Sequence, residues 1–234
     1  GGPSERVGLQ AGDRIITINK EKVTGIGIST TGVRKRLMGN KGTVVNISVF
    51  RKGEKDLLDF SITRDKIPIF SLDAAYMLDK TTGYVKFNKF AGTTEKEFEE
   101  ALVRLKKNGL KNIIIDLRAN GGGLMIPATE LANHFFTNQR LLVYLIGRKT
   151  PRQEHKSTGS GDLSSARIVV LTDEGSASAS EIFAGAIQDW DRGVIMGRRT
   201  FGKGLVQNAF YLTDGSMIRL TVARYYTPTG RSIQ

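Results

Sequence analysis

A run of alternating serine and alanine marks the part of the chain best suited to nucleophilic chemistry. The run is Gly175-Ser-Ala-Ser-Ala-Ser-Glu-Ile, and it follows an apolar strand and opens a helix with one apolar face. A hydroxyl at a helix N-terminus, here that of Ser178, lies beside free backbone N–H groups and the positive end of the helix dipole, which together stabilise an oxyanion. The competing interpretation is a capping box, in which Ser178 and Glu181 only satisfy backbone donors.

A serine hydroxyl needs a neighbouring base to become a good nucleophile, and Lys203 is the best candidate for that base. The two histidines, His134 in a predicted helix and His155 in a polar stretch, have no setting that suggests an oriented base. Lys203 lies between two glycines in Phe201-Gly-Lys-Gly-Leu-Val-Gln, where the chain can turn tightly and direct the amine inward. Burial favours the neutral amine that acts as a general base.

Gln207 is the residue predicted to orient that amine. If Lys203 to Tyr211 is extended, the two side chains share one face, because strand side chains repeat every two residues. The Gln207 amide can then hydrogen-bond the lysine. The alternative is an ordinary amide on a strand surface.

The same segment also has the spacing of a phosphate-binding loop, from Gly197 to Lys203. Two features argue against that function. Gly204 stands where Ser or Thr would ligate magnesium, and the residues beyond it are β-like instead of opening a helix.

A glycine-rich turn, Gly121 to Gly123, follows the buried run Ile113-Ile-Ile-Asp. Glycines at such a turn let the backbone approach a ligand and point N–H groups at it. Taken alone, the same glycines can serve only the geometry of a strand-to-helix turn.

The elements that must position these residues change in character near Ile67. Residues 1–66 alternate glycine-marked turns with short β runs and one helix, which predicts a small, mostly β domain. Residues 67–234 alternate strands with amphipathic helices, which predicts an α/β core with partly parallel strands. We expect the polar stretch Thr150–Ser165 to be an exposed loop. The predicted helices span residues 30–38, 94–107, 124–136 and 178–190; the predicted strands span 14–19, 43–50, 57–63, 84–87, 112–117, 141–146, 168–171, 193–196, 205–212 and 216–225.

Composition narrows the class of protein. Over 234 residues, 39% are hydrophobic and 25% charged, as in soluble globular proteins. Cysteine is absent, so any nucleophile must be a hydroxyl, an amine or a carboxylate.

No apolar run approaches the ~20 residues of a membrane-spanning helix, and Gly1–Leu9 has no signal-peptide pattern. The net charge of +12 suits an anionic partner, but the basic residues are scattered in short groups, which favours an ordinary solvated surface, so we expect no nucleic-acid partner.

Four blocks together closely resemble the carboxyl-terminal processing (tail-specific) peptidases, in that family's order. The blocks begin at Asp116, Glu174, Phe201 and Thr221: Asp-Leu-Arg-Ala-Asn-Gly-Gly-Gly, Glu-Gly-Ser-Ala-Ser-Ala-Ser-Glu-Ile, Phe-Gly-Lys-Gly-Leu-Val-Gln and Thr-Val-Ala-Arg-Tyr-Tyr-Thr-Pro-Thr-Gly-Arg-Ser-Ile-Gln. Ahead of them, Val7-Gly-Leu-Gln-Ala-Gly-Asp-Arg-Ile-Ile-Thr-Ile-Asn resembles part of a PDZ domain. In PDZ domains of this type the carboxylate-binding loop would lie upstream of Gly1, which leaves the predicted helix 30–38 as one wall of the groove.

The resemblance implies a fold similar to the crotonase and Clp protease cores, preceded by a partial, mostly β PDZ domain. It implies that Ser178 is the nucleophile, Lys203 the general base and Gln207 the residue that orients the lysine, with an acyl-enzyme intermediate and no metal or organic cofactor. The oxyanion hole would use the N–H of Ala179 and that of a glycine, either Gly122 or Gly123.

The resemblance also implies biological expectations. The substrates would be unfolded or flexible proteins with apolar C-terminal tails, which the PDZ domain would bind while gating the active site. The protein would work outside the cytoplasm of a bacterium, in the periplasm or cell envelope, and a membrane tether upstream and a homodimer are left open. The alternative function is a gated or inactive peptide-binding scaffold.

Overall fold

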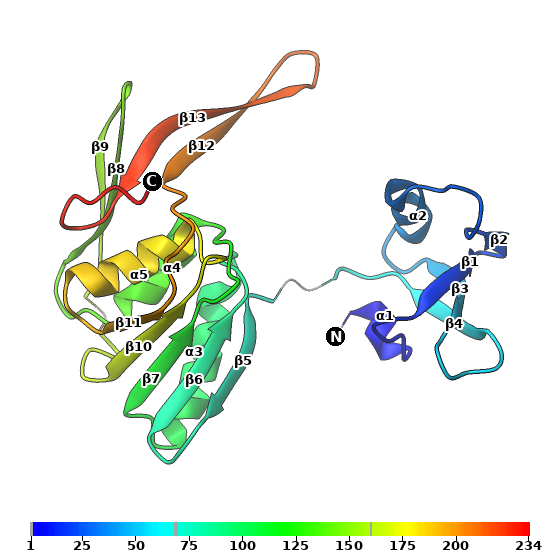
Figure 1. Ribbon diagram of the computed structural model, residues 1–234, viewed down its shortest axis with the longest axis horizontal. Helices are drawn as coiled ribbons and strands as arrows, with labels where there is room; N and C mark the ends of the chain where they lie inside the picture. Colours follow the sequence, from blue (N-terminus) through cyan, green and yellow to red (C-terminus); the bar gives the residue numbers. More distant parts are fainter. Residues whose placement is uncertain (1, 68–69, 160) are drawn as a thin grey trace. The chain divides into compact units, whose positions relative to one another are not determined.

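The computed structural model describes residues 2–67, 70–159 and 161–234. The chain divides into two compact units, Gly1–Ile69 and Phe70–Gln234 (Figure 1). Each unit has its own hydrophobic core. The domain boundary predicted from the sequence lies between residues 66 and 67.

The first unit is a small, mostly β domain. Its elements are α1 (Pro3–Arg6), β1 (Arg14–Ile18), β2 (Glu21–Lys22), α2 (Thr30–Leu37), β3 (Val44–Phe50) and β4 (Leu58–Thr63). The strands form one antiparallel sheet in the order β2-β1-β3-β4. Strand β3 buries Val45, Ile47 and Val49 and leaves their neighbours more exposed, which is the two-residue period of a half-buried strand. Helix α2 starts after Ser29, whose hydroxyl accepts a hydrogen bond from the Gly32 N–H.

The second unit is built on a five-stranded sheet in the order β11-β10-β7-β6-β5. Its strands are β5 (Leu72–Met77), β6 (Thr82–Phe87), β7 (Asn112–Asp116), β10 (Arg167–Thr172) and β11 (Val194–Gly197), and only β5 is antiparallel to its neighbour. The helices are α3 (Thr94–Lys107), α4 (Met125–Asn133) and α5 (Ala179–Asp189). Their residues Phe98, Leu131 and Phe183 are buried in one core with Ile115 and Val170 of the sheet. This mixed α/β architecture agrees with the sequence prediction.

The parallel strands bring the predicted site residues to one edge of the sheet. Because β6, β7, β10 and β11 run in the same direction, their carboxyl ends meet at that edge. Gly121–Gly123 follows β7, Ser178 follows β10, and Lys203 follows β11. Segments that lie far apart in the sequence are thereby placed on neighbouring strands.

A second, antiparallel sheet completes this unit in the order β12-β13-β8-β9. It contains β8 (Leu141–Gly147), β9 (Thr150–Lys156), β12 (Leu205–Tyr211) and β13 (Met217–Tyr226), and Figure 1 shows its two hairpins projecting away from the parallel sheet. The prediction of an exposed loop over Thr150–Ser165 was wrong for residues 150–156, because the apolar strand β8 supplies β9 with backbone hydrogen bonds whatever the polarity of its side chains. The sequence pattern also missed α1, β2 and β5.

No helix in the described part of the chain has both the length and the apolar character needed to cross a membrane.

Candidate active site

Ser178 lies at a sharp turn between β10 and α5. Its backbone has φ 56° and ψ −112°, a combination that residues other than glycine seldom adopt. Backbone strain of this kind is concentrated at functional sites, where the surrounding structure holds it in place. The helix begins at the next residue, Ala179, so the Ser178 side chain lies at the helix N-terminus, as the sequence predicted.

The three serines of the run have different environments. Ser176 and Ser180 are both 0% exposed, and their hydroxyls donate hydrogen bonds to the carbonyl oxygens of Leu117, at 2.7 Å, and Asn120, at 2.9 Å. Ser178 is half-buried. Two hydroxyls therefore hold the turn together, and that of Ser178 is the one a substrate could reach.

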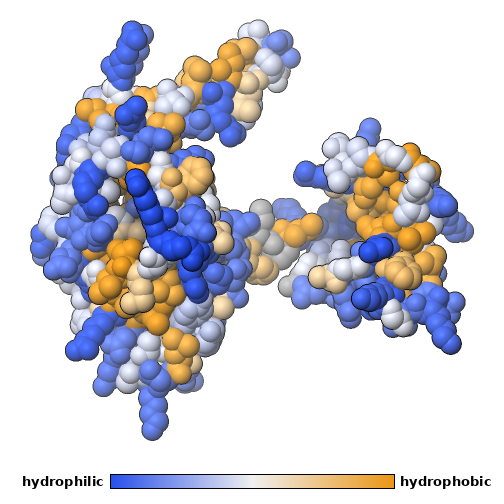
Figure 2. Space-filling view, in the orientation of Figure 1, coloured by the Kyte–Doolittle hydropathy of each residue, from blue (hydrophilic) through white to orange (hydrophobic). Residues whose placement is uncertain are grey.

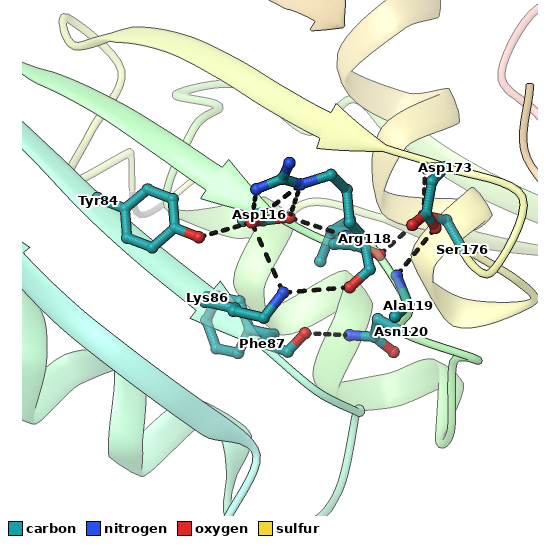
Figure 3. A network of polar contacts seen from close by, with 10 residues as sticks. Tyr84, Lys86, Phe87, Asp116, Arg118, Ala119, Asn120, Asp173 and Ser176 are labelled. Carbon is teal, nitrogen blue, oxygen red and sulfur yellow. Dashed lines mark hydrogen bonds and ion pairs between the residues drawn. The ribbon is translucent and has the colours of Figure 1, made fainter. Parts of the chain in front are cut away.

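Asn120 connects this turn to the glycine-rich turn after β7. Its side chain is completely buried, and Nδ2 donates to the carbonyl oxygen of Phe87 at 3.1 Å (Figure 3). Its Oδ1 accepts from the N–H of Gly122 at 2.9 Å. Its carbonyl oxygen accepts from the N–H of Ala177 at 3.0 Å. Sequence reasoning missed this role, because Asn120 entered only as one letter of a motif.

Gly122 and Gly123 lie too close to other atoms to carry a side chain. A Cβ at Gly122 would lie 2.8 Å from the Cβ of Ser178 and 2.9 Å from the backbone nitrogen of Ala179, and a Cβ at Gly123 would lie 2.0 Å from the carbonyl oxygen of Phe90. Both glycines also have positive φ, 93° and 142°. The turn therefore packs directly against the start of α5.

The backbone N–H groups of this turn differ in availability. The N–H of Gly122 is occupied by Asn120. Within the described residues, that of Gly123 donates no backbone or side-chain hydrogen bond. Ala179, as the first residue of α5, has no intrahelical acceptor for its N–H.

Glu181 joins the Ser178 turn to the Lys203 loop. The residue is 6% exposed, and its carboxylate accepts hydrogen bonds from three backbone N–H groups, those of Ser178 at 2.8 Å, Gly202 at 2.6 Å and Lys203 at 2.8 Å. The bond from Ser178 is the glutamate half of the predicted capping box. The same carboxylate holds the backbone of the candidate base beside that of the candidate nucleophile, a link that the sequence did not reveal.

The side chains of Lys203 and Gln207 are both exposed within this unit. The inward direction expected for the Lys203 amine is therefore not found here. Strand β12 begins only at Leu205, and its pairing shifts register between Val206 and Gln207, so a strict two-residue period does not relate the two side chains. A β-strand instead of a helix follows the Gly197–Lys203 segment, which supports the argument against a phosphate-binding loop.

Asp116 anchors the end of β7 through the network in Figure 3. This carboxylate is 0% exposed and accepts hydrogen bonds from Tyr84 at 2.6 Å and Arg118 at 2.7 Å, while the Lys86 amine lies 3.6 Å away. Burial raises the pKa of Asp116, but the hydrogen bonds from Arg118 and Tyr84 outweigh that effect and hold the pKa at about 2. The network fixes the strand end from which the Asn120 turn departs.

Neither histidine belongs to the segments that contain Ser178 and Lys203. His134 packs in the protein interior. It is 4% exposed, with Nε2 2.9 Å from a Glu95 carboxylate oxygen and its ring edge-on to Phe98. Among the residues that the structure describes, no group of three or more His, Asp or Glu side chains could hold a metal ion.

Comparisons with known proteins agree with the two-part organisation. The family described as "Peptidase family S41" matches residues 81–234, and the one described as "PDZ domain" matches residues 1–51. The chain is 35% identical to a carboxyl-terminal-processing protease of Picosynechococcus sp. and 36% identical to a probable CtpA-like serine protease of Staphylococcus aureus. A solved structure of a photosystem II D1 C-terminal processing protease superimposes with a TM-score of 0.65 at 33% identity, over 100% of this chain and 63% of the other.

Both curated relatives are longer than this chain. The matches cover 100% of it but 56% and 46% of the two relatives, so the chain spans about half of their length.

Proposed function

Because the chain belongs to peptidase family S41, we propose that it is a serine endopeptidase in which Ser178 attacks a peptide carbonyl and Lys203 accepts the hydroxyl proton. The acyl-enzyme would then be released by water. The observation that carries this proposal is the buried Glu181 carboxylate, which holds the backbones of both residues within one hydrogen bond of itself. Geometry that brings a hydroxyl and a base together is the first requirement for such a pair.

The oxyanion hole of this proposal consists of the N–H groups of Ala179 and Gly123. Both lie beside the Ser178 turn, and neither is used by the described structure, whereas the Gly122 N–H is bonded to Asn120. Two free donors at a helix start suit the charge that develops on the substrate carbonyl oxygen.

The exposure of Lys203 and Gln207 supports a gated form of this function. In the active arrangement Gln207 orients the amine, and some further surface must exclude water from it. A peptide-binding scaffold without turnover is the second candidate, and the same exposure favours it.

The name of one relative, a carboxyl-terminal-processing protease, suggests that this chain removes C-terminal segments. We propose in addition that its substrates are flexible proteins with apolar tails and that the PDZ domain binds the tail and controls access. A location outside the cytoplasm of a bacterium, in the periplasm or cell envelope, belongs to the same proposal.

A fluorophosphonate probe tests the nucleophile directly. Intact-mass analysis and peptide mapping should place one adduct on Ser178, and Ser178→Ala should lose both the adduct and the cleavage of an unstructured, apolar-tailed protein. Ser164→Ala, at an exposed serine outside the site, is the matched control and should retain both. Unchanged cleavage by Ser178→Ala would refute the endopeptidase, and binding of tail peptides without an adduct would favour the scaffold.

A further inference from the structure

Strand β12 forms one edge of the second sheet. One side of β12 pairs with β13, and no other described strand of this unit pairs with its outer side. The outer side of an edge strand presents a row of N–H and C=O groups with which another extended chain can pair. Proteins normally protect such edges with charges, prolines or short strands.

The opposite edge of the same sheet has this protection. Strand β9 contains Pro151 and the charged residues Arg152, Glu154 and Lys156. The sequence of β12, Leu-Val-Gln-Asn-Ala-Phe-Tyr, contains neither a charge nor a proline over seven residues. The β9 edge of this sheet is protected and the opposite edge, β12, is not, which indicates that β12 is available for pairing.

The pairing register identifies the groups that point outward. The Leu212 N–H donates to the carbonyl oxygen of Ser216, so Leu212 faces β13. Backbone groups alternate along an antiparallel strand, and the register is regular from Gln207 onward. The N–H and C=O groups of Gln207, Ala209 and Tyr211 therefore face away from β13.

The position of the edge favours the substrate as the added strand. β12 begins two residues after Lys203, whose backbone Glu181 ties to that of Ser178. A chain paired along β12 is thus directed toward the candidate nucleophile.

The side chains of the hairpin favour an apolar partner that carries no positive charge. Strands β12 and β13 contain Arg219 and Arg224 but no acidic residue. Phe210, Ile218 and Leu220 are 44–51% exposed, and Figure 2 shows hydrophobic residues on the surface of the projecting β12–β13 hairpin. A second copy of the hairpin would bring like charges together, whereas an apolar, neutral or acidic segment would not.

We propose that the outer edge of β12, from Gln207 to Tyr211, binds an extended apolar segment of the substrate by strand addition. This inference rests on the proposed endopeptidase function. It assigns the affinity for the substrate to main-chain hydrogen bonds, which suits an enzyme that accepts many sequences.

The test uses the full chain and substitutions at Ala209. Ala209→Pro removes one outward N–H and leaves the β13 side of the ladder intact, because proline is tolerated on edge strands. For a fluorogenic apolar peptide we expect KM to rise about tenfold, as expected when a main-chain hydrogen bond and its neighbour are lost, with kcat nearly unchanged. Ala209→Val, the matched control, keeps the N–H and should retain the wild-type KM.

A second measurement does not depend on the folding of a proline variant. Apolar peptides with backbone N-methyl groups at alternate positions should compete poorly for the wild-type protein, by about tenfold, compared with their unmethylated counterparts. Equal competition, or a wild-type KM for folded Ala209→Pro, would overturn the proposal. A dimer of the wild type that Ala209→Pro dissociates would also overturn it, by showing that a second copy occupies the edge.

Fluorophosphonate labelling separates this inference from the proposed function. The probe needs Ser178 but no extended chain, so both Ala209 variants should be labelled at the wild-type rate. Absence of both labelling and cleavage of an unstructured, apolar-tailed protein in the wild type would refute the endopeptidase itself. Normal labelling with unaltered peptide KM in Ala209→Pro would refute only the role of the β12 edge.

Discussion

Replacing Glu181 by glutamine should uncouple the candidate nucleophile from the candidate base. In the wild type, Oε2 accepts the N–H groups of Ser178 and Lys203, and Oε1 accepts that of Gly202. Glutamine has one acceptor oxygen and one NH₂ group. If its oxygen keeps the two bonds of Oε2, its NH₂ must face the Gly202 N–H, so two donors point at each other.

The size of the effect follows from these three bonds. Leaving a buried donor unpaired costs about 1–3 kcal/mol, and hydrogen bonds to a charged acceptor lose roughly half their strength when it becomes neutral. We therefore expect Glu181→Gln to lower the free energy of unfolding by about 3 kcal/mol. If half of this free energy normally holds Lys203 in place for the reaction, the labelling rate of Ser178 falls about tenfold; if all of it does, the rate falls about a hundredfold.

The assay compares Glu181→Gln with Glu97→Gln by thermal unfolding and by the rate of fluorophosphonate labelling. Glu97 is a matched control, because its Oε2 also accepts two backbone N–H groups, from Ser71 and Leu72, each at 2.9 Å. Both variants should unfold at lower temperature, but only Glu181→Gln should be labelled slowly. Equal labelling rates in the two variants would show that the Glu181 bonds have no part in positioning the site.

Three further outcomes are expected. Lys203→Ala should lower kcat/KM by about 10²–10⁴-fold. Its melting temperature should not change, because the side chain is exposed. A lowered melting temperature that accounts for the lost activity would contradict a role as base. Gly123→Ala should destabilise the protein by about 3 kcal/mol or more, since its Cβ would clash with a carbonyl oxygen, whereas Gly121→Ala, with nothing within 4 Å, should be neutral in chemical denaturation. Because the pKa of Asp116 is lowered to about 2, its ionised carboxylate stabilises the fold above about pH 4, and this stabilisation is lost as the pH falls toward 2. The difference in free energy of unfolding between wild type and Asp116→Asn should therefore shrink by about 2 kcal/mol between pH 5 and pH 2.

Helices and strands were predicted best from the sequence where the hydrophobic residues follow one clear helical or strand period. The helix α3 was placed at its observed bounds, because Phe98, Leu102 and Leu105 recur at helical spacing on a polar background. Strand β9 was missed because its polar residues show no alternation, and its pairing with β8 depends on a contact that local pattern does not encode.

For the candidate site, the sequence predicted residue types and the ends of strands, and the fold supplied the connections. The position of Ser178 at a helix start follows from the pattern alone, but its strained φ and ψ do not. Likewise, Asn120 and Glu181 acquire their roles only when turns that are distant in the sequence come together. Hydrogen bonds from side chains to distant backbone groups leave no periodic signal that a single sequence could show.

The exposure of Lys203 sets a condition on any mechanism that uses it as a base. An amine accepts a proton only when it is uncharged, and removal of water is what favours that form. Within the described residues of the second unit, the Lys203 and Gln207 side chains both remain in contact with solvent. The covering surface must therefore come from elsewhere in the protein or from the substrate. A substrate strand added to the outer edge of β12 would lie beside Gln207 in the plane of the sheet, which makes the substrate one candidate for part of that covering surface.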